Sequence, residues 1–366
     1  MPTTINTPPT FITEYGIPIR NLWHMLLYAW NELPEVKLTT VAEVDHAPTL
    51  DSLLALMLTN LLRQRLRVGL GRGYTQTQGA IKSIRGRVNF SQSLKRRAFE
   101  QGQAWCEYQP YHQNTLKNKI IRSTVLHLIR AGDFGKSQNQ AREMRHHLQS
   151  LFHALEGVDL LDLTPDLTRR QVFERDDQDY RLMLAICDLV VQRHMPTNAN
   201  GERLQPSLEH DALTLHSIYE RFVANFYRLK LKGWAVSAQK HLHWHEAFSN
   251  DLLPVMRPDL VLEHLASGKI LVIDTKFTAH SLIQTPWGKQ EFDSSHLYQL
   301  YTYLKTQEHL SERHRRAEGI LLYPSTTSKT LSQKIQLQDM SIRVESVDLS
   351  APWQEIEENL IRVVNR

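Results

Sequence analysis

The chain has 366 residues, of which 41% are hydrophobic and 22% are charged, and this composition is that of a globular protein and excludes a disordered or fibrous one. Lys and Arg number 43 against 39 Asp and Glu, and the resulting net charge of +4 permits nucleic-acid binding without requiring it. Two cysteines, Cys106 and Cys187, are too few for a disulfide framework and form no CxxC pair, which argues for a reducing compartment and against a thiolate zinc site.

The sequence carries no sign of export or membrane insertion. Its first residues, MPTTINTPPTFITEYG, lack the basic and apolar regions of a signal peptide. No uninterrupted run of about 18 apolar residues occurs anywhere in the sequence. We therefore expect a protein that works in the cytoplasm and has no membrane span.

The first half of the chain is predicted to be mainly helical. Residues 1–16, rich in Thr and Pro, are expected to form a loose arm. Residues 74–90 alternate small, basic and apolar side chains around Gly79 and Gly86, which predicts strands or a β-hairpin. Apolar residues at helical spacing predict helices over 21–30, 51–70, 114–131, 138–155 and 180–193.

The pattern changes after residues 194–207, which collect Pro, Asn, Gly and Ser and are the best candidate for a linker. A helix over 213–232, strands over 234–245, 260–262, 270–273 and 319–323, and a helix over 293–306 follow. This alternation predicts a mixed sheet flanked by helices. We expect an α/β (α+β overall) protein with two domains, a mainly helical one at 1–195 with a β insert near 74–90, and an α/β one at 205–366.

Charged residues stand at the ends of two apolar strands. The runs at 260–262 and 270–273 are separated by a turn, so they are predicted to form a hairpin. Asp259 precedes the first strand, and after fourteen intervening residues the second strand ends in Asp274-Thr275-Lys276. In an antiparallel pair the start of one strand faces the end of the other, and residues two apart project to one side. Two carboxylates and an amine are therefore expected to converge.

Such a cluster suits a divalent cation. Two buried carboxylates repel each other unless one takes up a proton or a cation lies between them. Their hard oxygen atoms suit Mg²⁺, and the backbone carbonyl of Thr275 could be a further ligand. Lys276 would then orient a metal-activated water and stabilise charge on a phosphoryl group, which predicts phosphodiester hydrolysis. The alternative is that Asp274 and Lys276 form an ordinary ion pair and that Asp259 is a turn residue.

Two predicted helices bring further polar residues into consideration. Gln299 and Tyr303, at i and i+4, share a stripe apart from the apolar stripe of their helix and could face the site or contact DNA. The alternative is an exposed Gln and a half-buried Tyr. Glu220, in the helix over 213–232, is a possible third carboxylate. It points away from the apolar stripe of that helix, so we expect it to be solvated.

Three histidines, His241, His243 and His245, share one face of a predicted strand and could bind zinc. No fourth ligand stands at a recognisable spacing. A solvated or DNA-facing strand is therefore the expected reading.

The segments Arg257-Pro258-Asp259 and Ile273-Asp274-Thr275-Lys276, with the helix of Gln299 and Tyr303, resemble the PD-(D/E)xK nuclease signature as it occurs in the McrC family. McrC is the nuclease subunit of a GTP-dependent, methylcytosine-directed restriction system. Segments at 17–30, 84–90 and 114–121 are similar to the same family, so the resemblance covers most of the chain. It implies a restriction-endonuclease-like C-terminal domain in which Asp259, Asp274 and Lys276 are catalytic.

The resemblance also implies a partner. McrC proteins dock through their N-terminal domain into the pore of a hexameric AAA+ GTPase, McrB, stimulate its GTP hydrolysis and cut double-stranded DNA. Carried over to this chain, the basic residues Lys82, Arg85 and Arg87 are candidates for the docking surface. The sequence GLGRGY at 69–74 lacks the GK[ST] of a phosphate-binding loop, which fits a subunit whose partner binds the GTP. The alternatives are a non-catalytic DNA-binding adaptor that activates the GTPase, and a stand-alone repair nuclease of the same fold.

Overall fold

The structure is a computed structural model that describes residues 15–30, 47–74, 76–164, 167, 178–194, 208–244, 252–277, 283–284, 290–327 and 330–366. Most of the predicted arm and linker lies outside these residues. The chain divides into two compact units, one formed by residues 1–53 together with 204–366 and the other by residues 54–203. The expected change near residue 200 is therefore present, but the first 53 residues group with the C-terminal part and not with the helical part. No helix among the described residues is long and apolar enough to cross a bilayer.

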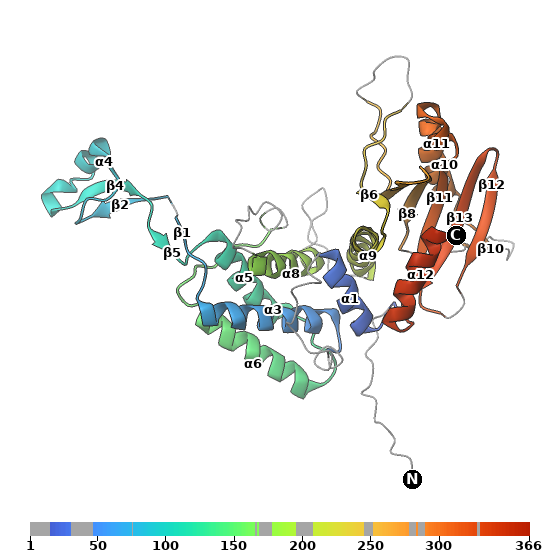
Figure 1. The fold of residues 1–366 in the computed structure, drawn as a ribbon. Helices are drawn as coiled ribbons and strands as arrows, with labels where there is room; N and C mark the ends of the chain where they lie inside the picture. The colour runs from blue at the N-terminus through green and yellow to red at the C-terminus, as the bar shows by residue number, and fades with distance from the viewer. Residues whose placement is uncertain are drawn as a thin grey trace, which may run out of the picture. The chain divides into compact units, whose positions relative to one another are not determined.

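The first unit is built on a six-stranded mixed sheet (Figure 1). Strands β6, β7 and β8 are antiparallel, β8, β11 and β13 are parallel, and β12 is antiparallel to β13. In sheet order the strands are β12 (Ser332–Leu337), β13 (Met340–Asp348), β11 (Glu318–Ser325), β8 (Ile270–Thr275), β7 (Leu260–His264) and β6 (Trp234–Ala238). The central strands are buried along most of their length, as their continuous apolar runs predict for strands covered on both faces.

Helices cover both faces of this sheet. Helix α10 (Ser294–Gln307) packs on β8, β11 and β13, with Leu300 and Leu304 in a core that includes Val344. The neighbouring strand residue Arg343 points to the other face, where its Nη1 donates to the carbonyl of Val363 in α12 (Trp353–Asn365). Because Arg343 and Val344 are successive strand residues that point to opposite sides, α10 and α12 lie on opposite faces of the sheet. Short elements complete the unit: η2 (Glu308–Leu310), α11 (Glu312–Arg315), β9 (Ile283–Gln284) and β10 (Gln290–Glu291).

The N-terminal helix α1 (Ile19–Ala29) is part of the second helical layer. It packs against α9 (Leu208–Lys230), and Nδ2 of Asn225 in α9 donates to the last carbonyls of α1. The buried amide of Asn21 donates to the carbonyls of Leu349 and Ala351, at 2.8 and 2.9 Å. These bonds satisfy polar groups that would otherwise be unpaired inside the protein. They give the reason why α1 groups with the C-terminal part of the chain.

The second unit is mainly helical, as predicted. It contains most of α3 (Leu50–Val68), then α5 (Leu116–Ala131), α6 (Gln138–Ala154) and α8 (Gln178–His194). Between α3 and α5 the short strands β1 (Gly73–Tyr74) and β5 (Tyr111–His112) pair. The chain between them forms a small β insert, residues 77–108, with β2 (Thr77–Ile81), β3 (Arg87–Val88), α4 (Phe90–Lys95), η1 (Phe99–Gln101) and β4 (Ala104–Tyr108).

The predicted hairpin within residues 74–90 is wrong in its pairing. Strands β2 and β3 both pair with β4, in the order β2-β4-β3, and not with each other. Gly86 precedes β3 with a φ of +66°, and a Cβ at this position would overlap the backbone oxygen of Glu107 in β4. This close approach requires glycine and directs the chain onto β4.

Candidate active site

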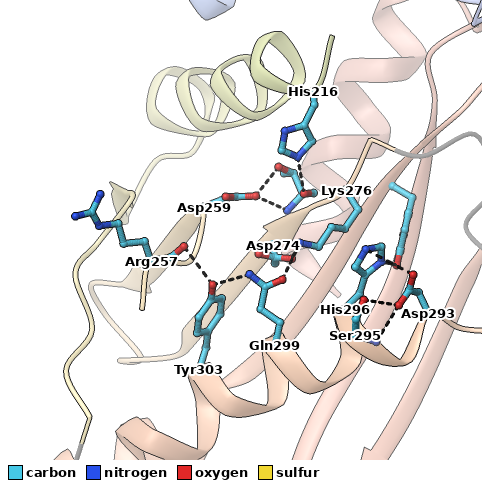
Figure 2. Close-up of polar contacts among 12 residues, drawn as sticks. His216, Arg257, Asp259, Asp274, Lys276, Asp293, Ser295, His296, Gln299 and Tyr303 are labelled. Carbon is cyan, nitrogen blue, oxygen red and sulfur yellow. Dashed lines mark hydrogen bonds and ion pairs between the residues drawn. The ribbon is translucent and has the colours of Figure 1, made fainter. Parts of the chain in front are cut away.

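The predicted hairpin of β7 and β8 is confirmed, and it brings the charged cluster together. Leu260 pairs with Ile273, and the same register continued by one residue sets Asp259 opposite Asp274. The backbone N–H and Oγ1 of Thr275 donate to Oδ2 of Asp259, at 2.7 and 2.6 Å. Nζ of Lys276 lies 2.7 Å from Oδ2 of Asp274. Figure 2 shows both carboxylates and the amine at this end of the two strands.

Asp274 is the most strongly perturbed carboxyl group of this cluster. Its side chain is only 2% exposed. Its pKa is raised to about 6, mainly by burial and also by the negative charge of Asp259, although Lys276 opposes the shift. Apart from the Lys276 ammonium, no described residue donates to Oδ2 of Asp274. A buried carboxylate whose pKa remains raised despite an adjacent ammonium is a place where a further cation would be stabilised.

The residues present fit a Mg²⁺ ion. This ion is commonly held by one or two carboxylates together with water and phosphate oxygens, and Asp259 and Asp274 provide two. Thr275, whose carbonyl could be a further ligand, follows Asp274 in the chain and donates to Asp259. The described part of the chain contains no group of three or more His, Cys, Asp or Glu arranged to bind a metal, so the cluster does not resemble a fully protein-coordinated zinc site.

Lys276 is held in place by a chain of polar side chains. Oε1 of Gln299 accepts from its Nζ at 2.9 Å, and Nε2 of Gln299 donates to the hydroxyl of Tyr303 at 2.7 Å. That hydroxyl lies 3.4 Å from the carbonyl of Arg257, next to the Pro258-Asp259 pair. Tyr303 is buried at 6% exposure, in contrast to the half-buried alternative, whereas Gln299 is exposed, as that alternative had it. Both side chains face the cluster. Because Tyr303 accepts from Nε2 of Gln299, the amide oxygen of Gln299 is the end that faces the ammonium of Lys276.

This series of side-chain hydrogen bonds predicts a defined effect for Tyr303→Phe. The substitution leaves the Gln299 amide without its acceptor, so the ammonium of Lys276 is positioned less well. We expect kcat for the predicted DNA cleavage to fall about fivefold, with KM for DNA nearly unchanged, since one hydrogen bond of about 1 kcal/mol is lost. Tyr301→Phe is the control, because its hydroxyl bonds Gln338 and not the cluster. Equal activity of both variants would contradict a role for Tyr303.

Glu220 was expected to be solvated, but it is half-buried and is bonded toward the cluster. Nε2 of Gln239 donates to Oε1 of Glu220 at 2.5 Å and lies 3.3 Å from Oδ1 of Asp259. Burial and the charge of Asp259 both raise the pKa of Glu220. Helix α9 buries residues on more than one side, among them Tyr219, Phe222 and Val223. The side of the helix that carries Glu220 can therefore also face the protein, although the strongest apolar stripe lies elsewhere.

Gln239 and His216 were missed by the sequence analysis. Gln239 has a φ of +50°, which is uncommon for a residue other than glycine, and its backbone N–H donates to the carbonyl of Asp259. Strand β6 ends one residue earlier, at Ala238, and not at 245 as predicted. Nε2 of His216, in α9, lies 3.4 Å from the carbonyl of Thr275. Neither residue belongs to a local motif, so no sequence signal indicated it.

The remaining candidates lie elsewhere. His241 and His243 are exposed and follow the end of β6, while His245 lies outside the described residues. Lys82, Arg85 and Arg87 are exposed in the β insert of the other compact unit.

Comparison with known proteins identifies the family. The family model described as "McrBC 5-methylcytosine restriction system component" matches residues 4–324. The chain is 26% identical over 351 residues to the "Type IV methyl-directed restriction enzyme EcoKMcrBC" of Escherichia coli (strain K12), and this match covers 95% of this chain and 97% of that protein. Its fold is similar, with a TM-score of 0.53, to a chain in a half-complex of Thermococcus gammatolerans McrB AAA+ hexamers with bound McrC, at 17% identity and over 95% of this chain and 75% of that chain. The chain therefore belongs to the McrBC 5-methylcytosine restriction system component family.

Proposed function

We propose that this chain is the endonuclease subunit of a GTP-dependent, 5-methylcytosine-directed restriction system and that it hydrolyses phosphodiester bonds in double-stranded DNA with Mg²⁺. The observation that carries this proposal is the buried carboxyl group of Asp274, with Asp259 across the hairpin and the ammonium of Lys276 at 2.7 Å. A charge cluster of this kind costs folding free energy, which a scaffold protein has no reason to retain. The six-stranded mixed sheet with α10 supports a PD-(D/E)xK assignment.

Each residue of the cluster has a distinct role in this proposal. Asp259, Asp274 and the carbonyl of Thr275 would hold the metal. Bound there, Mg²⁺ supplies the acidification of a water molecule and the neutralisation of phosphate charge. Lys276 orients that water and stabilises the additional negative charge of the transition state. Gln299 and Tyr303 position Lys276, and the hydroxyl of Tyr303 donates to the carbonyl of Arg257, the residue that precedes Pro258.

The proposed partner is a McrB-like AAA+ GTPase hexamer, which would bind the GTP. Support comes from the fold likeness to a chain in an assembly of McrB hexamers with bound McrC. The β insert, residues 77–108, supports docking through its charge: it holds six Lys and Arg against two Glu, and its net charge of +4 equals that of the whole chain. It also exposes Ile84, Phe90 and Leu94. Exposed apolar side chains among cations are typical of a protein interface.

Cleavage assays separate this proposal from its alternatives. The purified chain is incubated with methylated and unmethylated plasmid, with and without the GTPase and GTP, in Mg²⁺ or EDTA. The proposal predicts cutting of the methylated plasmid only when the GTPase, GTP and Mg²⁺ are all present. Cutting by the chain alone would support a stand-alone repair nuclease. Stimulation of GTP hydrolysis without any cutting would support the non-catalytic adaptor.

The docking surface gives a separate prediction. We expect Lys82→Ala/Arg85→Ala/Arg87→Ala to weaken binding to the GTPase about tenfold at low salt and to reduce the salt dependence of the association, because the removed charges attract the partner over distance. The control Arg63→Ala/Lys136→Ala/Arg142→Ala removes the same charge from exposed positions outside the β insert in the same unit. Binding is measured by fluorescence anisotropy over a salt series. If both variants weaken binding to the GTPase equally, binding depends only on net charge, and the three residues do not form the docking surface.

A further inference from the structure

Thr275 is held from two directions, although it carries no reactive group. It is fully buried between Asp274 and Lys276. On one side its N–H and Oγ1 donate to Oδ2 of Asp259. On the other side its carbonyl faces α9, where Nε2 of His216 lies 3.4 Å away. Figure 2 shows the imidazole reaching from α9 to this point. The N–H of Thr275 belongs to the peptide that it forms with Asp274, and its carbonyl belongs to the peptide that it forms with Lys276, so each of these two peptides is contacted from outside β8.

A single face of α9 reaches both carboxylates of the cluster. His216 and Glu220 are one helical turn apart, so they lie on the same side of α9. Glu220 is joined through Gln239 to Asp259. His216 is close enough to Asp274 for a protonated imidazole to favour the carboxylate form of that residue. Neither helix residue is in β7 or β8, so α9 acts on the cluster from outside the hairpin.

The chemistry of the contact fixes the state of the imidazole. A backbone carbonyl can only accept a hydrogen bond, so a neutral His216 bonded to it must carry its proton on Nε2. A separation of 3.4 Å is long for such a bond. Hydrogen bonds at active sites are often long in the free protein and tighten when substrate binds.

We propose that His216 is a positioning residue, which donates from Nε2 to the carbonyl of Thr275 and thereby holds the Thr275–Lys276 peptide in the orientation that cleavage needs. This inference rests on the proposed function, because it assigns a role in that same site. The other polar group of this peptide, the N–H of Lys276, donates to the carbonyl of Leu322 at 3.0 Å. Without the His216 donor, that bond alone holds the peptide plane, which can then tilt. A tilt displaces Lys276, whose N–H belongs to this peptide.

The first test reads the hydrogen bond itself and needs neither metal nor substrate. Long-range proton–nitrogen NMR spectra of the full-length, metal-free protein are recorded at about pH 8, where an ordinary imidazole is neutral. His216→Gln identifies the signal by its loss. The proposal predicts the Nε2–H tautomer for His216. The Nδ1–H tautomer would overturn it, because Nε2 would then be an acceptor facing another acceptor.

The second test separates positioning from simple loss of structure. With the GTPase, GTP and Mg²⁺ present, His216→Leu is expected to lower kcat for plasmid cleavage about tenfold with KM for DNA nearly unchanged. His216→Gln retains an N–H donor and is expected to recover to within about threefold of the wild type. A His216→Leu variant as active as the wild type, or a His216→Gln variant as impaired as His216→Leu, would overturn the proposal. If the wild type does not cut, the proposed function fails, whereas the tautomer result still decides whether the contact exists.

Discussion

Asp274→Asn is expected to lower the rate of DNA cleavage by at least about 10³-fold, because it removes the charge of a proposed metal ligand from a site whose proposed chemistry depends on charge stabilisation. Asparagine has nearly the same shape, so the packing around this buried position is retained. The measurement is single-turnover cleavage of methylated plasmid with the GTPase, GTP and Mg²⁺ present. Asp293→Asn is the matched control, since Asp293 caps α10 near the site and asparagine also caps helices well.

The same substitution is expected to stabilise the metal-free protein. The pKa of Asp274 is raised from 3.8 to about 6 in the folded state, so the folded protein binds more protons than the unfolded chain between these values. Stability is therefore unaffected by this group below about pH 4, decreases as the pH rises to about 6, and stays lower above it. Asp274→Asn removes this penalty, and we expect a gain of about 3 kcal/mol above pH 6.

Urea unfolding in EDTA from pH 4 to pH 8 measures the difference in free energy of unfolding between Asp274→Asn and the wild type. This difference should be close to zero at about pH 4 and reach its full size above about pH 6. Mg²⁺ should stabilise the wild type against unfolding and leave Asp274→Asn nearly unaffected, because a ligand that binds only the folded state stabilises it. Full cleavage activity in Asp274→Asn, or a stability difference independent of pH, would contradict the role assigned to this carboxyl group.

Lys276→Met is expected to reduce both activity and stability. Loss of the ammonium should lower cleavage about 10²- to 10³-fold, the usual effect of removing one group that stabilises transition-state charge. It also leaves Asp274 buried without its ion-pair partner, which should cost about 3 kcal/mol of stability above pH 6. Lys269→Met, near the start of β8, is the control. Its ion pair with Glu318 is longer, at 3.6 Å, and more exposed, so it should keep its activity.

A double variant tests the cause of the destabilisation. In Asp274→Asn/Lys276→Met neither charge is left unpaired, so stability above pH 6 should be near that of Asp274→Asn alone, above the wild type, while cleavage remains lost. If the two single effects simply add, so that the double variant is only as stable as the wild type, the ion pair is not the source of the effect. If Lys276→Met cleaves DNA at the wild-type rate, the assignment of Lys276 is wrong.

The hairpin that carries the cluster could be predicted because its information is local. Two apolar runs, a turn between them and the alternation of side chains in a strand suffice to set Asp259 opposite Asp274. Gln299 and Tyr303 could be selected for a similar reason, since residues four apart lie on one face of a helix. In each case the spacing within one short segment determines the geometry.

The rest of the site depends on contacts between distant segments. Glu220 and His216 reach the cluster only because α9 packs beside the hairpin, and Gln239 does so through an uncommon backbone conformation. The placement of α1 follows from bonds between Asn21 and the carbonyls of Leu349 and Ala351, more than 300 residues away in the chain. No periodicity within one segment encodes such pairings.

Strand β13 was missed for a different reason. It is buried almost throughout, yet it includes Arg343 and Glu345, whose charges interrupt the apolar pattern expected for an inner strand. These residues pair with each other, and Arg343 also pairs with Glu318 of β11 at 3.2 Å. Buried charges are tolerated when they are paired in this way, but the pairing becomes visible only in the folded sheet.

Anomalous X-ray scattering from crystals of the full-length protein soaked with Mn²⁺ would show whether Asp259 and Asp274 hold a divalent cation, since Mn²⁺ also binds hard oxygen ligands and can be located without ambiguity. We expect a peak at coordinating distance, about 2.1 Å, from carboxylate oxygens of both Asp259 and Asp274, and no such peak in Asp274→Asn. A protein that cleaves DNA with Mn²⁺ but shows no ion between these two residues would contradict this expectation.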